Sequence, residues 1–323
     1  MIINKFPGKL FIVGEYFIME PDQVAVVAAV NKYLTVRVSK HQGFQLISDY
    51  GTMIDLKEPK NPRLKLAYLA SQTAYEYLNY LKITPDYNIE ITLDSDLLYE
   101  GKKIGLGSSG VVVVAVIWAI LNYHQLETSP LELFKLATLV QLKEGNMSSG
   151  GDIAAAAFKN TIIYKRYDLS WLLQQDYSYD LVSKPWPDLV IEPFKHELPN
   201  MIVAWSKKEN ITSHYLQEFK LFKKKNEAQF KQLKVKANHI GKAFAQDGNL
   251  SMLESYRLLM LELEMYLGIE IETESLREFI EESYQKGQIA KVSGSGGGDC
   301  AIAFGDDTKY KQKSIKILNI GRV

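Results

Sequence analysis

The sequence predicts an α+β protein with two lobes, and three observations support this fold class. Residues 2–47 are rich in Val, Ile and aromatic residues, which favour strands. Apolar residues recur at helical spacing over 64–81 and again beyond residue 212. Between these parts, the stretch 168–199 is irregular, with four prolines and two tryptophans, and it is the expected lobe boundary.

Length and charge limit the possible classes of protein. A chain of 323 residues with 46% hydrophobic composition can bury a large core, as one bilobal unit or two domains. We expect an N-terminal lobe over 1–190 and a C-terminal lobe over 191–323, with mixed or antiparallel sheets, helices in each lobe and a cleft between the lobes. Basic and acidic residues balance at 38 each, so no overall field attracts nucleic acid or a membrane.

Cysteine and histidine usage suggests a cytoplasmic protein without a structural metal. The single cysteine, Cys300, excludes an internal disulfide and favours a reducing compartment. The N-terminus lacks the pattern of a signal peptide, and the longest apolar run, 111–121, is too short for a membrane span. The five histidines are scattered and lack the close pairing of zinc ligands on one helix.

The first lobe reads as antiparallel strands followed by helices. The expected strands are 10–13, 24–30, 33–38, 87–93 and 161–164, and the expected helices are 64–81, 111–121, 131–143 and 153–158. The segment 111–121 is β-branched enough for a strand. Ser108 and Ser109 offer N-caps, however, and apolarity on every side fits a buried helix, so helix is preferred.

The second lobe begins with a strand at 201–205 and continues mostly as helix. Thr212 and Ser213 could cap one long helix that ends at Asp247-Gly248, because phenylalanines and other apolar residues recur at helical spacing. Further helices are expected at 251–267 and, capped by Thr273 and closed near Gly287, at 275–285. Two short apolar segments, 289–292 and 300–304, complete the lobe.

Three glycine-rich turns carry the functional signal: residues 7–16, 105–110 and 293–299. Glycine turns that expose backbone N–H groups form anion-binding nests and allow a polyphosphate to approach the chain closely. In a chain without net charge, such local sites are the way to bind phosphate. The three turns together therefore indicate an enzyme that handles phosphates.

The second turn has two competing interpretations. It matches G-x-G-x-x-G, the dinucleotide fingerprint, but it follows a polar loop instead of a strand, and an oxidoreductase leaves the other turns unexplained. The preferred interpretation is a helix N-terminus that binds a polyphosphate, with Ser108 or Ser109 donating a hydroxyl to Mg²⁺ or phosphate. Simple capping by these serines explains fewer of the glycines.

Taken together and in this order, the three turns resemble the three motifs of the GHMP small-molecule kinases, over the whole chain. The resemblance implies a two-lobed α+β fold with ATP and an acceptor in the cleft between the lobes, and Mg²⁺ bound with ATP near Ser108. It implies an ATP-binding set of Gly105, Leu106, Gly107, Ser108, Ser109 and Gly110.

Within the family, four segments of this chain resemble the bacterial branch that acts in the mevalonate pathway of isoprenoid biosynthesis. They are residues 8–16, 100–103, 213–214 and 296–300. Its acceptor, phosphomevalonate, is itself a phosphate monoester. The implied acceptor-binding residues are Lys9, Glu15, Tyr16, Lys102, Lys103, Ser148, Ser149, Gly150, Ser213, His214, Ser293, Gly294, Ser295 and Gly296. Mevalonate or homoserine as acceptor, and a non-catalytic ATP-binding relative, remain alternatives. We expect a monomer or homodimer.

Lys9 and Asp152 are the expected catalytic residues. Asp152 follows Ser148-Ser149-Gly150-Gly151, which matches the family's catalytic-aspartate segment. Taken alone it could be the N-cap of the helix 153–158, and the two roles are compatible. The second pKa of a phosphate monoester is about 6, so the attacking oxygen is already largely ionised at neutral pH. We therefore expect Lys9, with Lys102 or Lys103, to offset repulsion between anions, and Asp152 mainly to orient Lys9 and the acceptor.

Overall fold

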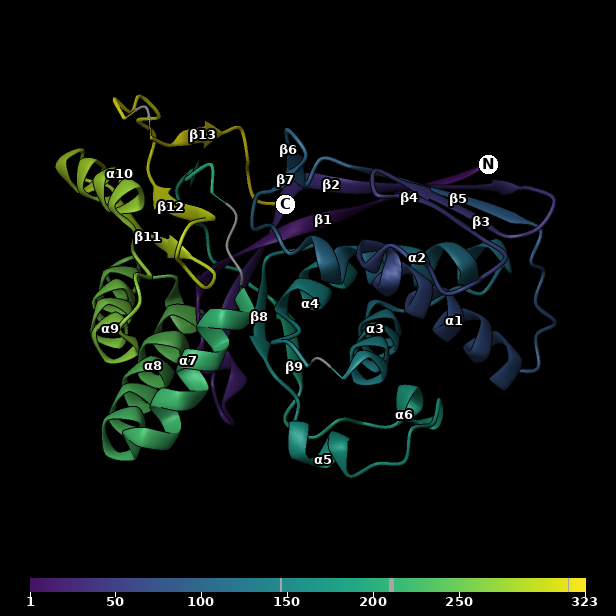
Figure 1. The fold of residues 1–323 in the computed structure, drawn as a ribbon. Coiled ribbons are helices and arrows are strands. Elements are labelled where there is room, and N and C mark those ends of the chain that lie inside the picture. The colour runs from purple at the N-terminus through teal and green to yellow at the C-terminus, as the bar shows by residue number, and fades with distance from the viewer. Residues whose placement is uncertain (146, 209–211, 313) are drawn as a thin grey trace.

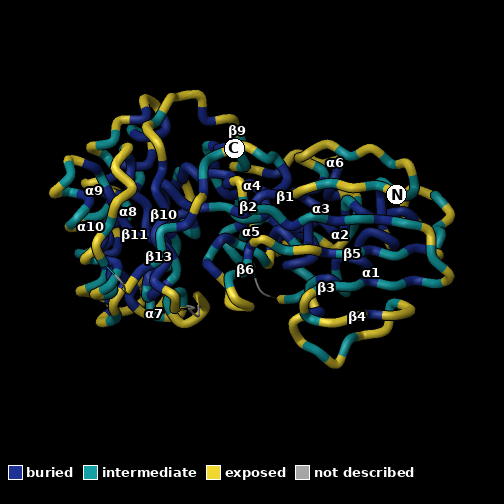
Figure 2. The backbone as a smooth tube through the Cα atoms, turned by 90° about the horizontal axis from the view of Figure 1, so that it is seen from above, coloured by how far each residue is buried: buried dark blue, intermediate teal, exposed yellow. Residues whose placement is uncertain are grey.

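The computed structural model describes residues 1–145, 147–208, 212–312 and 314–323, and it has two lobes side by side (Figure 1). This is the predicted α+β class, with mixed and antiparallel sheets and helices in each lobe. Buried residues run through the interior of both lobes, whereas exposed residues follow the turns and outer helix faces (Figure 2). Among the described residues, no helix is long and apolar enough to cross a membrane.

The first lobe is built on a seven-stranded sheet. Its strands are β1 (Ile2–Val13), β2 (Ala25–Lys40), β3 (Gln45–Ser48), β4 (Gly51–Ile54), β5 (Ile89–Ser95), β8 (Ile162–Lys165) and β9 (Val190–Pro193). The order is β4-β3-β5-β2-β8-β9, with β1 also paired to β2, and all pairs are antiparallel except β3 with β5. The two strands expected at 24–30 and 33–38 are one continuous strand, β2.

Four helices cover one face of this sheet (Figure 1). They are α1 (Lys65–Tyr80), α2 (Ser108–Tyr123), α3 (Pro130–Glu144) and α4 (Gly151–Phe158). The choice of helix over strand for 111–121 is confirmed, because α2 is enclosed by β1, β2 and the other three helices and needs no polar face. Short elements complete the lobe: η1 (Phe17–Met19), η2 (Pro62–Leu64), the hairpin β6 (Leu98–Tyr99) and β7 (Lys102–Lys103), α5 (Leu169–Leu173) and α6 (Asp180–Ser183).

The second lobe has an antiparallel sheet in the order β11-β12-β10-β13. Its elements are β10 (Met201–Trp205), α7 (Thr212–Lys225), α8 (Glu227–Asp247), α9 (Ser251–Leu267), α10 (Glu274–Gln285), β11 (Ile289–Ser293), β12 (Cys300–Phe304) and β13 (Lys316–Leu318). α9 and α10 pack on β11, so the strand that leads into the third glycine turn is held from one face by helices.

Three local expectations are wrong. The single long helix after Thr212 is broken at Asn226, whose backbone leaves the helical region, and the break lets Phe222 and Phe230 pack together at 5.9 Å between ring centroids. The stretch 168–199 is not wholly irregular, because α5, α6 and β9 lie in it. Gly107, in the left-handed conformation, occupies the N-cap position of α2, so Ser108 and Ser109 are its first helical residues and not its cap.

The segment that follows the first glycine turn, residues 17–24, packs against the second lobe. η1 places Phe17 against two aromatic residues of the second lobe, Phe219 at 5.4 Å and Phe230 at 6.0 Å between ring centroids. A Cβ added at Gly241 of α8 would lie 2.4 Å from the Val24 carbonyl oxygen, so only glycine permits this approach. β9 still belongs to the first sheet and β10 to the second; the division at 190/191 stays a prediction.

Candidate active site

The first and second glycine turns are in direct contact. The backbone N–H of Lys9 donates to the Leu106 carbonyl at 2.9 Å. A Cβ added at Gly8 would lie 3.0 Å from both the Cβ and the carbonyl oxygen of Leu106, so a side chain there would separate the two turns. The lysine of the first turn is thereby fixed beside the start of α2.

The second and third turns are also in contact. A Cβ added at Gly105 would lie 2.8 Å from Cβ and Cγ of Asp299. The Cys300 thiol donates to the Ile104 carbonyl at 3.1 Å, and burial raises the pKa of that thiol. Three segments that are far apart in the sequence therefore meet at one place, between the two lobes.

Lys9 and Asp152 lie together where these turns meet. A Cβ added at Gly107 would lie 2.7 Å from Asp152 Cβ and 3.1 Å from Cγ and Cε of Lys9. The Gly110 N–H donates to Asp152 Oδ2 at 3.1 Å, and the Ile153 N–H donates to Oδ1 at 3.0 Å. Lys9 Nζ also lies 4.8 Å from the centre of the Phe11 ring. The glycines of the second turn thus make room for the predicted catalytic pair.

Burial acts on the ionisation of Asp152. Desolvation raises the pKa of the Asp152 carboxyl, while the Lys9 ammonium and the amides of Ile153 and Gly110 act in the opposite direction. The residue as a whole is half-buried. Asp152 lies in the first turn of α4, whose N-cap is Gly150, so the alternative reading of Asp152 as the N-cap is wrong.

Side chains of α3 and β8 hold the loop before Asp152 in place. The Ser148 hydroxyl accepts from Gln141 Nε2 at 2.7 Å, and the Tyr164 hydroxyl donates to the Ser149 carbonyl at 2.8 Å. Gly150 has a φ of 78°, and a Cβ there would lie 2.7 Å from the Tyr164 hydroxyl. Ser148 and Ser149 are thus fixed near Asp152, as their predicted role requires.

A cavity of about 310 Å³ opens at the N-terminus of α2. Its wall includes both serines of the second turn, a lysine of the β6–β7 hairpin, and residues around α1. These residues are Ser108, Ser109, Lys103, Tyr50, Arg63, Leu66 and Val112, among others. A helix N-terminus presents unpaired amides and a positive dipole end, so the wall at Ser108 favours phosphate, and the apolar residues suit a flat ring.

The third turn is tied to the first turn and to the start of α7. The Tyr16 hydroxyl donates to the Ser295 carbonyl at 2.5 Å, and the Ser293 hydroxyl donates to the Phe11 carbonyl at 2.9 Å. Ser295 Oγ lies 3.3 Å from Thr212 Oγ1 in the first turn of α7, directly before Ser213. Ser213 and His214 are exposed.

The predicted site residues do not all lie at one place. Lys9, Asp152 and the second turn meet at one centre. Lys102 and Lys103 are exposed on the β6–β7 hairpin, and Lys103 borders the cavity. Glu15 does not face solvent, because its carboxylate is buried in an ion pair with Lys291. The roles assigned to these residues stay predictions.

Sequence reasoning did not select four residues that build the site: Asp299 against Gly105, Tyr164 behind Ser149, and Lys291 and Tyr256 around Glu15. Asp299 could have been suspected from its place directly after the glycine run. The other three lie inside ordinary apolar segments, where nothing in the local sequence marks them. No group of three or more His, Cys, Asp or Glu that could hold a metal occurs in the described part of the chain.

Models of one kinase family match both lobes of the chain. The model of the GHMP kinase N-terminal domain matches residues 67–160, and that of the GHMP kinase C-terminal domain matches residues 242–319. Together they account for more than half of the chain, and this protein belongs to the GHMP kinase family. The predicted resemblance is therefore confirmed.

Two of the similar proteins are phosphomevalonate kinases. The chain is 27% identical to the phosphomevalonate kinase of a Streptomyces species, over 94% of this chain and 90% of the relative. Its structure resembles that of a protein from Listeria innocua, with a TM-score of 0.90, 28% identity and coverage of 99% and 98%. It also resembles Streptococcus pneumoniae phosphomevalonate kinase in complex with phosphomevalonate and AMPPNP, with a TM-score of 0.86, 27% identity and full coverage of both chains.

Proposed function

We propose that this protein is a phosphomevalonate kinase. It transfers the γ-phosphoryl group of ATP to phosphomevalonate, yielding diphosphomevalonate and ADP, in the mevalonate pathway of isoprenoid biosynthesis. The observation that carries the proposal is the meeting of three glycine turns around Lys9 and Asp152, in a chain that aligns along its whole length with a phosphomevalonate kinase of the same fold.

ATP is expected to bind with its phosphates at the N-terminus of α2 and its nucleoside in the cavity of about 310 Å³. The left-handed conformations of Gly105 and Gly107 turn the backbone at the start of the helix, where free amides meet an anion. Lys103, at the edge of the cavity, adds a positive charge. The acceptor then lies on the opposite side of Lys9, near Tyr16, Ser148 and the third turn.

The residues at this site fit a Mg²⁺ ion that arrives with ATP. Such an ion keeps several waters and needs only one or two protein ligands beside the phosphates. Ser108, at the first position of α2 and on the cavity wall, offers a hydroxyl, while the Asp152 carboxylate lies beside the same turn. When bound, the ion would neutralise charge on the transferring phosphoryl group.

The main problem of the reaction is to hold two anions together. The acceptor phosphate is largely ionised at neutral pH, so little is gained from a general base. Lys9 supplies positive charge at the centre, and the Asp152 carboxylate holds the Lys9 side chain by its opposite charge. For an alcohol acceptor the raised pKa of Asp152 would instead suit proton removal, because a stronger base accepts the hydroxyl proton more readily.

A substrate panel tests the proposal. Release of ADP would be measured with Mg-ATP and phosphomevalonate, mevalonate or homoserine in turn, with the diphosphate product identified by ³¹P NMR. Turnover with phosphomevalonate alone is the expected result. Turnover only with one of the alcohols would replace the acceptor but keep the kinase, and ATP binding without turnover on any acceptor would overturn the enzymatic proposal.

A further inference from the structure

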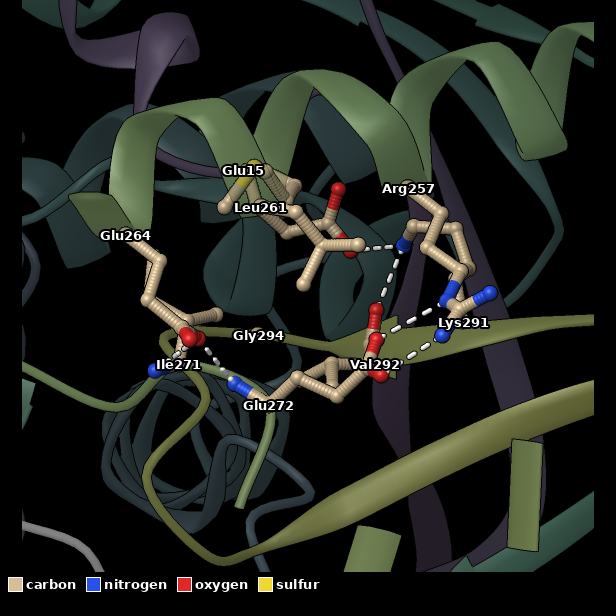
Figure 3. A pocket seen from close by; sticks show the side chains of 10 residues that line it. Glu15, Arg257, Leu261, Glu264, Ile271, Glu272, Lys291, Val292 and Gly294 are labelled. Carbon is tan, nitrogen blue, oxygen red and sulfur yellow. Dashed lines mark hydrogen bonds and ion pairs between the residues drawn. The ribbon is translucent and has the colours of Figure 1, made fainter. Parts of the chain in front are cut away.

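A buried ion pair joins the first glycine turn to the strand that precedes the third. The Lys291 ammonium of β11 contacts the Glu15 carboxylate, and it donates a second hydrogen bond to the Val292 carbonyl at 2.6 Å. The two residues are only 1% and 3% exposed. Figure 3 shows Glu15 and Lys291 on the wall of a small pocket, together with residues of α9.

Such a pair is a poor way to gain stability. Removing two charges from water is unfavourable, and a well-packed apolar pair is often as stable or more so. Desolvation lowers the pKa of Lys291, and only the Glu15 charge and hydrogen bond oppose that effect. The second carboxylate oxygen of Glu15 has no hydrogen-bond partner among the described residues. We therefore look for a role of the ion pair in fixing the position of neighbouring residues.

The pair holds a strained turn. Tyr16, the next residue, has a φ of 61°, which is unfavourable for a bulky side chain. The Glu15 carbonyl accepts from the Tyr256 hydroxyl of α9 at 2.7 Å, so both the backbone and the side chain of Glu15 are fixed by the second lobe. With Glu15 fixed in this way, the Tyr16 hydroxyl reaches the Ser295 carbonyl at 2.5 Å.

Helix α9 also supports the third turn, through residues 271–272. Glu264 of α9 accepts from the backbone N–H groups of Ile271 at 2.7 Å and Glu272 at 2.8 Å. The Ile271 carbonyl accepts from the Gly297 N–H of the third turn at 2.8 Å. Arg257 of α9 binds Glu272 through two hydrogen bonds, at 2.7 and 2.9 Å (Figure 3). α9 thus supports the first turn through Tyr256 and the third turn through Glu264.

From these contacts we propose that Lys291 is a positioning residue for the acceptor phosphate, acting through Glu15 to fix Tyr16 and the Ser295 backbone as one surface. This inference rests on the proposed function, because the acceptor is taken to bind at that surface. Lys291 does not touch the nucleotide cavity, so its loss should weaken acceptor binding and leave ATP binding unchanged.

The test compares single and double substitutions. Lys291→Met leaves the Glu15 carboxylate buried without its cation, and we expect a lower melting temperature and a KM for phosphomevalonate raised at least tenfold. In the double variant Glu15→Gln/Lys291→Met both charges are gone. We expect it to recover thermal stability while the raised KM for phosphomevalonate persists, because the turn is still not held.

The controls distinguish a specific effect on acceptor binding from a general disturbance of the fold. The Kd for a non-hydrolysable ATP analogue, measured by calorimetry, should stay within twofold in every variant. Lys286→Met removes a partly buried lysine paired with Glu282 on α10, away from the turns, and should leave both constants unchanged. If Lys291→Met does not fold, Tyr256→Phe provides a milder version, since it removes only the bond to the Glu15 carbonyl, and should raise the same KM about threefold.

Three results would overturn the inference: an unchanged KM for phosphomevalonate in Lys291→Met, recovery of that KM together with stability in the double variant, or equal losses of acceptor and nucleotide binding. A wild-type protein without activity on phosphomevalonate would instead contradict the proposed function, and the inference would fall with it.

Discussion

The two parts of the proposed active site are built differently. The proposed acceptor side, formed by the turn at Gly14-Glu15-Tyr16 and the third turn at 293–299, is buried or half-buried, and hydrogen bonds and an ion pair from both lobes hold it. The proposed nucleotide side, formed by the cavity and the β6–β7 hairpin, is open, and the two lysines of the hairpin are exposed.

This difference suggests where the protein needs a fixed geometry. Dipoles and charges that are already in place need no reorganisation when the transition state forms, which favours a rigid surface for the acceptor dianion. In the proposed reaction ATP would bring its own cation and many contact points, so exposed lysines near its phosphates would suffice. The following predictions test this contrast, from the largest expected effect to the smallest.

Lys9 lies between the two sides, and its loss should have the largest effect. We expect Lys9→Met to lower kcat about a thousandfold, because a charge aimed at the transferring phosphoryl group is lost. Steady-state kinetics checks this, with Lys5→Met on the same strand as the control, since Lys5 only lies over the Tyr33 ring. A loss confined to the KM for ATP would place Lys9 on the nucleotide side alone.

Gly110→Ala tests how tightly the centre is packed. A Cβ at this position would lie 2.5 Å from Cγ and Oδ2 of Asp152, so the carboxylate must move, and we expect kcat/KM to fall about a hundredfold. The backbone of Gly110 is ordinary helix, so the fold should persist, as circular dichroism would show. Gly321→Ala, whose Cβ would meet Asn31 only at 3.6 Å, is the matched control. Full activity in Gly110→Ala would mean that the position of Asp152 is unimportant.

Tyr16→Phe probes the acceptor side with a single atom. It removes the hydrogen bond to the Ser295 carbonyl, and we expect the KM for phosphomevalonate to rise about fivefold, with ATP binding unchanged. Tyr75→Phe removes another partly buried hydroxyl, one that donates to the Asp86 carbonyl, and serves as control. An effect of Tyr16→Phe on ATP binding would contradict the separation of the two sides.

Lys103→Met probes the nucleotide side. The lysine is exposed and its charge is screened, so we expect the KM for ATP to rise about threefold, and less at high ionic strength. Lys57→Met, an exposed lysine of the same lobe, should have no effect. A tenfold or larger, salt-independent loss would show that this side is as preorganised as the other.

The last prediction concerns stability: Asp152→Asn should stabilise the fold slightly. Because burial raises the Asp152 pKa, the carboxyl is relatively favourable below the unfolded-state pKa of about 3.9, and that contribution is lost as pH rises through the folded-state pKa. The Asn side chain of the variant does not ionise, so the variant does not lose this stability as pH rises. Thermal melts from pH 4 to 8 should show a variant that becomes more stable than wild type as pH rises, with the difference vanishing toward pH 4. A difference independent of pH would contradict the raised pKa.

The same variant tests the chemical role of Asp152. If the residue mainly orients Lys9 and the acceptor, kcat with phosphomevalonate should fall moderately, and its pH profile should show no ionising base that Asp152→Asn removes. A loss of many thousandfold that abolishes a titrating base in the profile would instead make Asp152 a general base.

Much of this protein is determined by local sequence. The helices α1, α9 and α10 follow from apolar spacing and end signals, and the strands β10 and β12 from short apolar runs, because each pattern depends on neighbours a few residues apart. The glycine turns and the aspartate after Gly150-Gly151 identify the family, since phosphate chemistry requires glycine at those places whatever surrounds them.

Only the tertiary structure decided which charges are used where. Lys291 and Glu15 are 276 positions apart, and nothing in the sequence of β11 distinguishes Lys291 from a solvated lysine. The break at Asn226 depends on how Phe222 and Phe230 meet, and the N-cap of α2 on the room that Gly107 leaves for Lys9 and Asp152. Local patterns determine the helices and strands. Burial and pairing of charges depend on contacts between distant residues, which form only when the two lobes pack together in the folded protein.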